Sequence, residues 1–291
     1  MNFQKAERKK AKLRLALAGP SGSGKTYSAI QIAKGMGGKI AVIDTERGSA
    51  ELYGDMCDYD VCQLSAPFTP QKYLEAIKEA EKLGYDVIVV DSLSHAWAGE
   101  GGLLDIHDKA TKAQRGENSY TAWREVTPWH NKLVDAVLQS PAHMIVTLRT
   151  KTAYELQDDN GKKKPVKVGL APVFRDGIEY EVTVFLDLSI EGNVASASKD
   201  RTRMFRGQYF TPTAETGVQL RKWLESGVDA PAPASNEVLL RIIKSCNGDR
   251  EKTLSELTQF LGREITSTKE LTAAEAAQFL AAREQFLAEA A

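Results

Sequence analysis

The chain has 291 residues, and its 38 basic and 39 acidic side chains give a formal charge of −1. Binding to nucleic acid must therefore come from local basic patches and not from a basic surface as a whole. The length suits one large domain and a small one. The three cysteines (Cys57, Cys62 and Cys246) have no C-x-x-C spacing, so we expect neither a disulfide nor a metal site from them. The apolar runs are too short to span a membrane and the N-terminus is charged, so we expect a cytoplasmic protein.

Residues 13–34 (LRLALAGPSGSGKTYSAIQIAK) read as a buried strand, a glycine-rich turn and a helix. Within them Gly19, Gly24, Lys25 and Thr26 fit the pattern G-x-x-x-x-G-K-[ST]. Glycines let backbone N–H groups curl around phosphate oxygens, and the start of the helix attracts the same anion. A turn that merely joins a strand to a helix is the alternative. Because the flanking strand and helix are those that the motif requires, we predict a nucleoside triphosphate site.

The chemistry of this motif assigns individual roles. Lys25 is predicted to reach the β- and γ-phosphates, and the Thr26 hydroxyl to hold Mg²⁺. The residues expected to bind ATP in the loop are Gly19, Pro20, Ser21, Gly22, Ser23, Gly24, Lys25 and Thr26.

Two further apolar runs lead into carboxylates. Residues 39–44 (KIAVID) read as a buried strand that precedes Glu46, and residues 85–91 (YDVIVVD) read as a second that ends at Asp91. A carboxylate at the C-terminal end of a parallel strand is, in a P-loop protein, the expected partner of Mg²⁺ or of its water. A cap for the following segment is the alternative for Asp91. The predicted metal site therefore consists of Thr26 and Asp91.

The other elements follow from periodicity and turn residues. They are a helix that begins at Pro70 and ends at Gly84, a loop-rich segment at 92–120, a helix at about 121–139, a buried strand at 143–148, a mobile basic loop at 152–169, a β-hairpin formed by 179–190 and 194–198, a short strand near 204–210 and a helix at about 213–224.

The order of these elements predicts the fold class and the domains. Alternating strands and helices indicate an α/β fold with an open, mostly parallel sheet flanked by helices. The expected division is a basic N-terminal arm at 1–12, an ATPase core at 13–225, a linker at 226–235 (SGVDAPAPAS) and a small helical module at 236–291.

Two segments resemble the RecA-like ATPases. Residues 40–53 (IAVIDTERGSAELY) are similar to the segment that follows the second strand of those proteins, and residues 87–97 (VIVVDSLSHAW) to their Walker B strand. The resemblance implies that Glu46 activates the attacking water, that Tyr53 stacks on adenine, and that Asp91 is the Walker B carboxylate. RecA carries a glutamine as γ-phosphate sensor after its third strand. This chain has none there, so the role is assigned to Arg149.

The resemblance covers roughly residues 13–210 and lacks the large N-terminal region of bacterial RecA. A core this reduced is similar to the RecA-like proteins of bacteriophages, the Sak-four group of annealing proteins and recombinases. This likeness implies a magnesium-dependent, DNA-stimulated ATPase that acts on single-stranded DNA in a bacterial host cell. It also implies that the protein acts together with a single-stranded-DNA-binding protein.

Two further patterns bear on assembly. In RecA-like motors a basic pair at the position of Lys199 and Arg201 reaches the γ-phosphate of the neighbouring subunit. An ordinary solvated strand end is the alternative. Phe3 and Ala6 match the F-x-x-A element that archaeal RadA-type recombinases insert into a neighbour. Both patterns predict a homo-oligomer, either a filament or a ring.

Two basic segments fall where RecA-like proteins hold single strands. Single-strand binders pair cationic grooves with aromatic stacking platforms, and Tyr120, Trp123 and Trp129 lie near the first segment. Both tryptophans also suit a helix packed in the core, and a lysine run also suits a plain solvated loop. The predicted DNA-binding residues are Lys112, Arg115, Lys151, Lys162, Lys163, Lys164 and Lys167.

The sequence leaves two other functions open. A small-molecule P-loop kinase would use residues 149–167 as a lid, but Glu46 and the basic pair Lys199 and Arg201 suit water activation and subunit coupling better. A nucleotide-gated adaptor would recruit a partner through its helical tail.

Overall fold

The computed structural model describes residues 5–113, 118–159, 162–229 and 232–289, with the backbone alone described for 153–159, 162–168 and 286–289. The chain divides into two compact units. The larger is Lys12–Leu224, and the smaller combines Met1–Ala11 with Glu225–Ala291.

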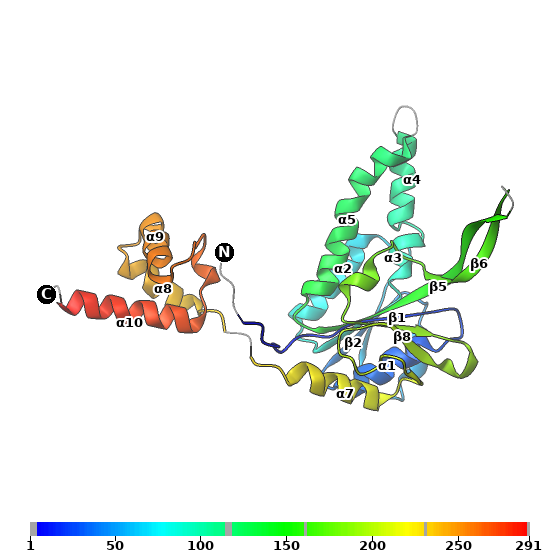
Figure 1. Ribbon diagram of the computed structural model, residues 1–291, viewed down its shortest axis with the longest axis horizontal. Coiled ribbons are helices and arrows are strands. Elements are labelled where there is room, and N and C mark those ends of the chain that lie inside the picture. Colours follow the sequence, from blue (N-terminus) through cyan, green and yellow to red (C-terminus); the bar gives the residue numbers. More distant parts are fainter. Residues whose placement is uncertain (1–4, 114–117, 160–161, 230–231, 290–291) are drawn as a thin grey trace. The chain divides into compact units, whose positions relative to one another are not determined.

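The larger unit is an α/β fold built on a nine-stranded, mostly parallel sheet (Figure 1), which confirms the predicted fold class. The strand order is β3-β2-β4-β5-β1-β7-β8-β9, and β6 pairs only with β5. The six strands from β3 to β7 in this order are parallel, whereas β6, β8 and β9 are antiparallel to their neighbours. The strands are β1 (Arg14–Gly19), β2 (Ile40–Asp44), β3 (Asp60–Gln63), β4 (Val87–Asp91), β5 (His143–Asp159), β6 (Lys162–Pro172), β7 (Val184–Leu188), β8 (Ala195–Asp200) and β9 (Tyr209–Phe210).

Helices cover both faces of this sheet (Figure 1). Alternate residues of β4 show the two layers: Ile88 and Val90 pack with α2 and α5, whereas Val87 and Val89 pack with α1 and α7. A strand buried on both faces reads as a continuous apolar run, which is why the sequence pattern of the central strands was clear. The helices are α1 (Lys25–Met36), α2 (Pro70–Lys82), α3 (Ser94–Ala98), α4 (Leu103–Ala113), α5 (Ser119–Gln139), α6 (Ile178–Glu181) and α7 (Ala214–Glu225).

Three segments differ from the prediction. The expected loop at 92–120 contains α3 and α4, because the glycines at 99–102 only separate two helices. The expected strand at 179–190 begins at Val184, and α6 precedes it. The edge strand β3 was missed since its side chains are mostly exposed and carry no apolar alternation.

The expected loop at 152–169 is also wrong, because β5 and β6 form an antiparallel ribbon there. Their pairing runs from Thr150 opposite Pro172 to Asp159 opposite Lys162. Lysines and Pro165 made this segment resemble a loop, yet a two-stranded ribbon has free edges where proline is tolerated. The ribbon projects from the sheet, as does the far end of the helical hairpin of α4 and α5, whereas the C-terminal half of α5 packs on the sheet (Figure 1).

The smaller unit has its own apolar core. Its helices are α8 (Asn236–Ser245), α9 (Arg250–Leu261) and α10 (Ala273–Glu289), and Leu239, Ile242, Leu257 and Phe279 are among the side chains that they bury together. Part of the N-terminal arm pairs with the start of the expected linker. Backbone bonds join residues 8–10 to Val228, and the Lys10 ammonium lies 2.6 Å from the Asp229 carboxylate.

Candidate functional site

The turn between β1 and α1 has the backbone geometry that its glycines predict. Gly22 and Gly24 have φ angles of 81° and 78°, a left-handed conformation that only glycine adopts without strain. A Cβ at Gly19 would lie 2.4 Å from the Ser23 hydroxyl oxygen, so close packing requires glycine there too. The Lys25 ammonium donates to the Pro20 carbonyl (2.8 Å). Burial lowers the pKa of Lys25, and the negative charge of Asp91 opposes this.

Asp91, at the end of β4, is bound by two hydroxyl groups. Thr26 donates to its Oδ2 (2.5 Å), and Thr147 of β5 donates to its Oδ1. The carboxylate is 1% exposed, and this burial raises the pKa of Asp91, although the two hydrogen bonds oppose the shift. Thr147 was not predicted as a site residue. No local pattern identifies it, since only the pairing of β5 beside β4 brings it to Asp91.

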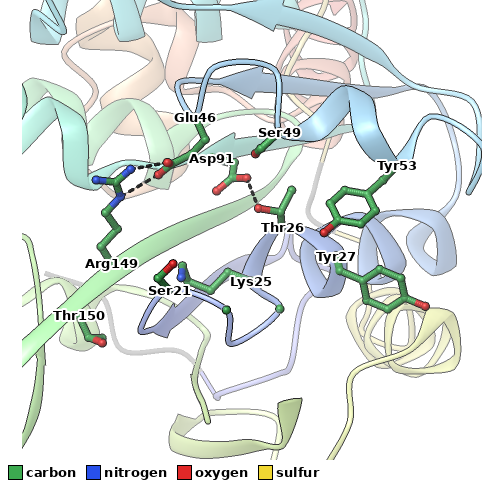
Figure 2. Close-up of a pocket in the computed structure, with 12 residues that line it drawn as sticks. Ser21, Lys25, Thr26, Tyr27, Glu46, Ser49, Tyr53, Asp91, Arg149 and Thr150 are labelled. Atoms are coloured by element: carbon green, nitrogen blue, oxygen red, sulfur yellow. Dashed lines mark hydrogen bonds and ion pairs between the residues drawn. The ribbon is translucent and has the colours of Figure 1, made fainter. Parts of the chain in front are cut away.

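Glu46 and Arg149, which both line the cavity, form a two-pronged ion pair (Figure 2). The Arg149 Nε lies 2.9 Å from Oε1 of Glu46, and its terminal nitrogen donates to Oε2. Ser92 donates to the same Oε1 (3.0 Å). Burial alone would raise the pKa of Glu46, but the hydrogen bond and charge of Arg149 outweigh it and hold the pKa below its ordinary value. Two residues assigned separate roles are thus direct partners.

The loop that carries Glu46 is shaped by Asp44, at the end of β2. Its two oxygens accept the backbone N–H groups of Glu46 (2.5 Å) and Ala50 (3.1 Å). Aspartate commonly caps backbone N–H groups ahead of it in this manner. The signal in the sequence is the position of Asp44 two residues before Glu46, although the strand pattern alone assigns it no role.

These groups surround a cavity of about 510 Å³. At one side Tyr53 meets Tyr27 edge to face, with ring centroids 5.8 Å apart, while Arg149 and Thr150 lie at the other (Figure 2). The cavity is lined by Ser21, Gly22, Gly24, Lys25, Thr26, Tyr27, Glu46, Ser49, Tyr53, Asp91, Arg149 and Thr150.

The predicted basic pair lies elsewhere. Lys199 and Arg201 both donate to the Tyr180 carbonyl, the latter at 2.8 Å. Lys199 pairs with Phe185, which is level with Ala16, three residues before the turn at Gly19. The pair thus lies toward the amino-terminal ends of the parallel strands, whereas the P-loop follows the carboxyl end of β1. A role in this chain's own cavity does not fit that position, whereas a role toward a neighbouring copy remains a prediction.

The predicted DNA-binding and assembly residues are spread over the two projections and the N-terminal arm. Lys112 is exposed near the end of α4, and Lys151 is exposed on β5. Trp123 stacks between Trp97 (5.8 Å) and His107 (4.2 Å), which agrees with a packed helix. Four lysines lie on β6, and their side chains are outside the described part: Lys162, Lys163, Lys164 and Lys167. Arg115 and Phe3 fall outside the described residues. Ala6 is exposed.

A family model for an AAA domain matches residues 11–216, most of the chain. The chain belongs to this AAA domain family. The match and the geometry of the turn together place the larger unit among the P-loop NTPases, whose domains bind and hydrolyse nucleotides. A comparison with curated proteins found no match. No helix in the described part of the chain is both long and apolar enough to cross a membrane.

The cavity residues fit a nucleotide held with Mg²⁺. The hydroxyl oxygen of Ser49 is buried in the cavity wall without a hydrogen-bond partner, and so offers a polar contact to a bound molecule. Across residues 5–113, 118–159, 162–229 and 232–289, no group of three His, Cys, Asp or Glu side chains could hold a metal by itself. Mg²⁺ typically needs only one or two protein oxygens beside phosphate and water, and Thr26 and Asp91 provide these.

Proposed function

We propose that this protein is an ATP-binding and ATP-hydrolysing RecA-like protein that acts on single-stranded DNA in the homologous recombination or strand annealing of a bacteriophage. The observation that carries the proposal is that Glu46 and Arg149 line the same cavity as Lys25, Thr26 and Asp91. A phosphate-binding half and a half able to activate water thus face the same space.

In this reaction Lys25 would bind the β- and γ-phosphates, and Thr26 and Asp91 would hold Mg²⁺, which when bound would neutralise charge on the phosphate oxygens. Tyr53 offers its ring to the adenine base. Glu46 orients the attacking water and accepts its proton, a role in which a positioned carboxylate contributes about 10²–10⁴ in rate.

The ion pair makes this role conditional. A carboxylate whose two oxygens both accept bonds from Arg149 has a lowered pKa and is a poor proton acceptor. Guanidinium groups also bind phosphate in a two-pronged manner. A terminal phosphate that attracts Arg149 would therefore free Glu46 for water. Arg149 would then both sense the phosphate and release the base.

The DNA-binding part of the proposal rests on the ribbon. Arg149 and Lys151 lie on β5, and the lysines at 162–164 and 167 lie on its partner β6. The strand that enters the cavity thus continues into the basic ribbon. Lys199, which is half-buried, and Arg201, which is exposed, lie toward the opposite end of the parallel strands and would serve the cavity of a neighbouring copy in a homo-oligomer.

The test is ATP hydrolysis measured with and without single-stranded DNA at several protein concentrations. Stimulation by DNA that rises faster than linearly with protein is the expected result. A turnover rate per protein molecule that changes with neither DNA nor protein concentration would contradict an active site that a neighbouring copy completes.

A nucleotide-gated adaptor is the second candidate, because the smaller unit has an apolar core of its own and could bind a partner. Removal of residues 226–291 separates the two proposals. An adaptor loses its biological function while ATP turnover persists, whereas the recombination protein depends on the basic ribbon.

A further inference from the structure

The turn between β7 and β8 contacts the phosphate-binding turn, although about 170 residues separate them in the chain. Asn193, the last residue of the short helical turn Glu191–Asn193, donates from its Nδ2 to the Gly22 carbonyl (3.1 Å). Its amide also packs beneath Gly24, where a Cβ would lie 3.2 Å from that Nδ2. One side chain therefore touches two of the glycines that line the cavity.

The first contact orients a peptide group. A trans peptide directs its C=O and N–H in opposite directions. In the peptide that joins Gly22 to Ser23, the carbonyl accepts from Asn193 and the N–H donates to the Pro20 carbonyl (3.3 Å). The peptide is thus held at both ends. A rotation of this plane would turn the Gly22 carbonyl elsewhere, and a carbonyl oxygen that faced the phosphates would repel them.

Asn193 is itself fixed by its turn. Its φ angle is 50°, in the left-handed region that asparagine tolerates better than most residues. Ser189 closes the turn through its hydroxyl, which donates to the Glu191 carbonyl (2.8 Å), and through its N–H, which donates to the Val194 carbonyl (2.9 Å). The side-chain amide is therefore presented to Gly22 from a braced backbone.

We propose that Asn193 is a positioning residue for phosphate binding, which holds the Gly22–Ser23 peptide in the orientation that an anion requires. This inference rests on the proposed binding of ATP. It predicts an effect on ATP and ADP alike, since the turn serves phosphates that both nucleotides share.

The variants Asn193→Gly and Asn193→Asp test it, because both residues accept the left-handed backbone. Loss of the amide in Asn193→Gly should raise the Kd for both nucleotides and the KM for ATP about threefold to tenfold, as expected when one hydrogen bond is removed. Asn193→Asp should weaken binding further, because a carboxylate cannot donate to Gly22 and brings negative charge toward the phosphates. In both variants kcat should stay within about twofold, since ground-state and transition-state binding are weakened together.

Asn247 provides the matched control. It also has a left-handed backbone (φ 63°) but lies between α8 and α9 in the smaller unit. Asn247→Gly and Asn247→Asp should leave nucleotide affinity at the wild-type value. The unfolding temperature of all four variants without nucleotide reports any general damage.

The possible outcomes distinguish a failure of the role of Asn193 from a failure of the proposed ATP binding. Wild-type affinity in Asn193→Asp, or an equal loss in Asn247→Asp, would overturn the role of Asn193 while ATP binding stands. A lowered kcat with unchanged KM would also overturn it. A wild-type protein that binds neither nucleotide would overturn the proposed function, and the inference with it.

Discussion

The phosphate side of the cavity and the side that holds Glu46 are stabilised by different kinds of contact. On the phosphate side, Asp91 is 1% exposed and bound by hydroxyls on short side chains. On the other side, the side chains of Glu46 and Arg149 are 23% and 47% exposed. Because this ion pair is partly exposed, solvent screens it and can replace its contacts more readily than those of the buried Asp91. The cavity thus combines a rigid binding half with a half that can rearrange.

The largest expected effect comes from the rigid half. Lys25→Ala removes the cation that lies against the Pro20 carbonyl of the turn, and it should abolish measurable ATP binding and turnover. A binding titration and a hydrolysis assay check this, with Lys34→Ala, in the last turn of the same helix, as the control. Wild-type affinity in Lys25→Ala would remove the turn from the nucleotide site.

The next effect concerns the half that rearranges. Glu46→Gln keeps the size of the side chain but cannot accept a proton, so ATP should bind normally while kcat falls about 10²-fold or more. Rapid mixing with a single turnover of ATP separates binding from hydrolysis. Normal turnover in this variant would contradict the RecA-like assignment of Glu46.

Arg149→Ala tests, through the pH dependence of activity, whether Arg149 controls the protonation of Glu46. Burial raises the pKa of Glu46, and the hydrogen bond and charge of Arg149 are the largest of the effects that hold it below its ordinary value. Without the guanidinium the pKa should rise, so Glu46 becomes protonated at a higher pH and the acid limb of kcat/KM moves to higher pH. Titration of the Glu46 carboxyl by NMR measures the shift directly, and Arg149→Lys, which keeps the charge, should show a smaller one. An unmoved titration would show that the pair does not form in solution.

The smallest expected effect lies outside the cavity. Replacement of Lys162, Lys163 and Lys164 by Ala should reduce the log–log salt dependence of single-strand binding by about 0.7 for each DNA phosphate that these lysines neutralise. The matched control replaces Lys78, Lys82 and Lys222, which are exposed on helices of the core. Equal slopes for the two triple variants would exclude the ribbon from the DNA site.

Several features followed from the sequence by itself because they are local. Gly19, Gly24, Lys25 and Thr26 lie within eight residues, and the backbone between a strand and a helix has few ways to connect them. The central strands were equally clear, since burial on both faces demands continuous apolar runs. From these patterns the α/β class, the phosphate-binding turn and the carboxylates that end or follow the strands could all be predicted.

Only the tertiary structure decided which distant groups meet. Thr26 reaches Asp91 across 65 residues, Glu46 reaches Arg149 across 103, and Asn193 reaches Gly22 across 171. These meetings depend on the order of strands in the sheet, in which β5 lies between β1 and β4 and β7 lies on the other side of β1. The basic ribbon was hidden for a related reason. Its strands pair with each other outside the core, so no apolar periodicity marks them.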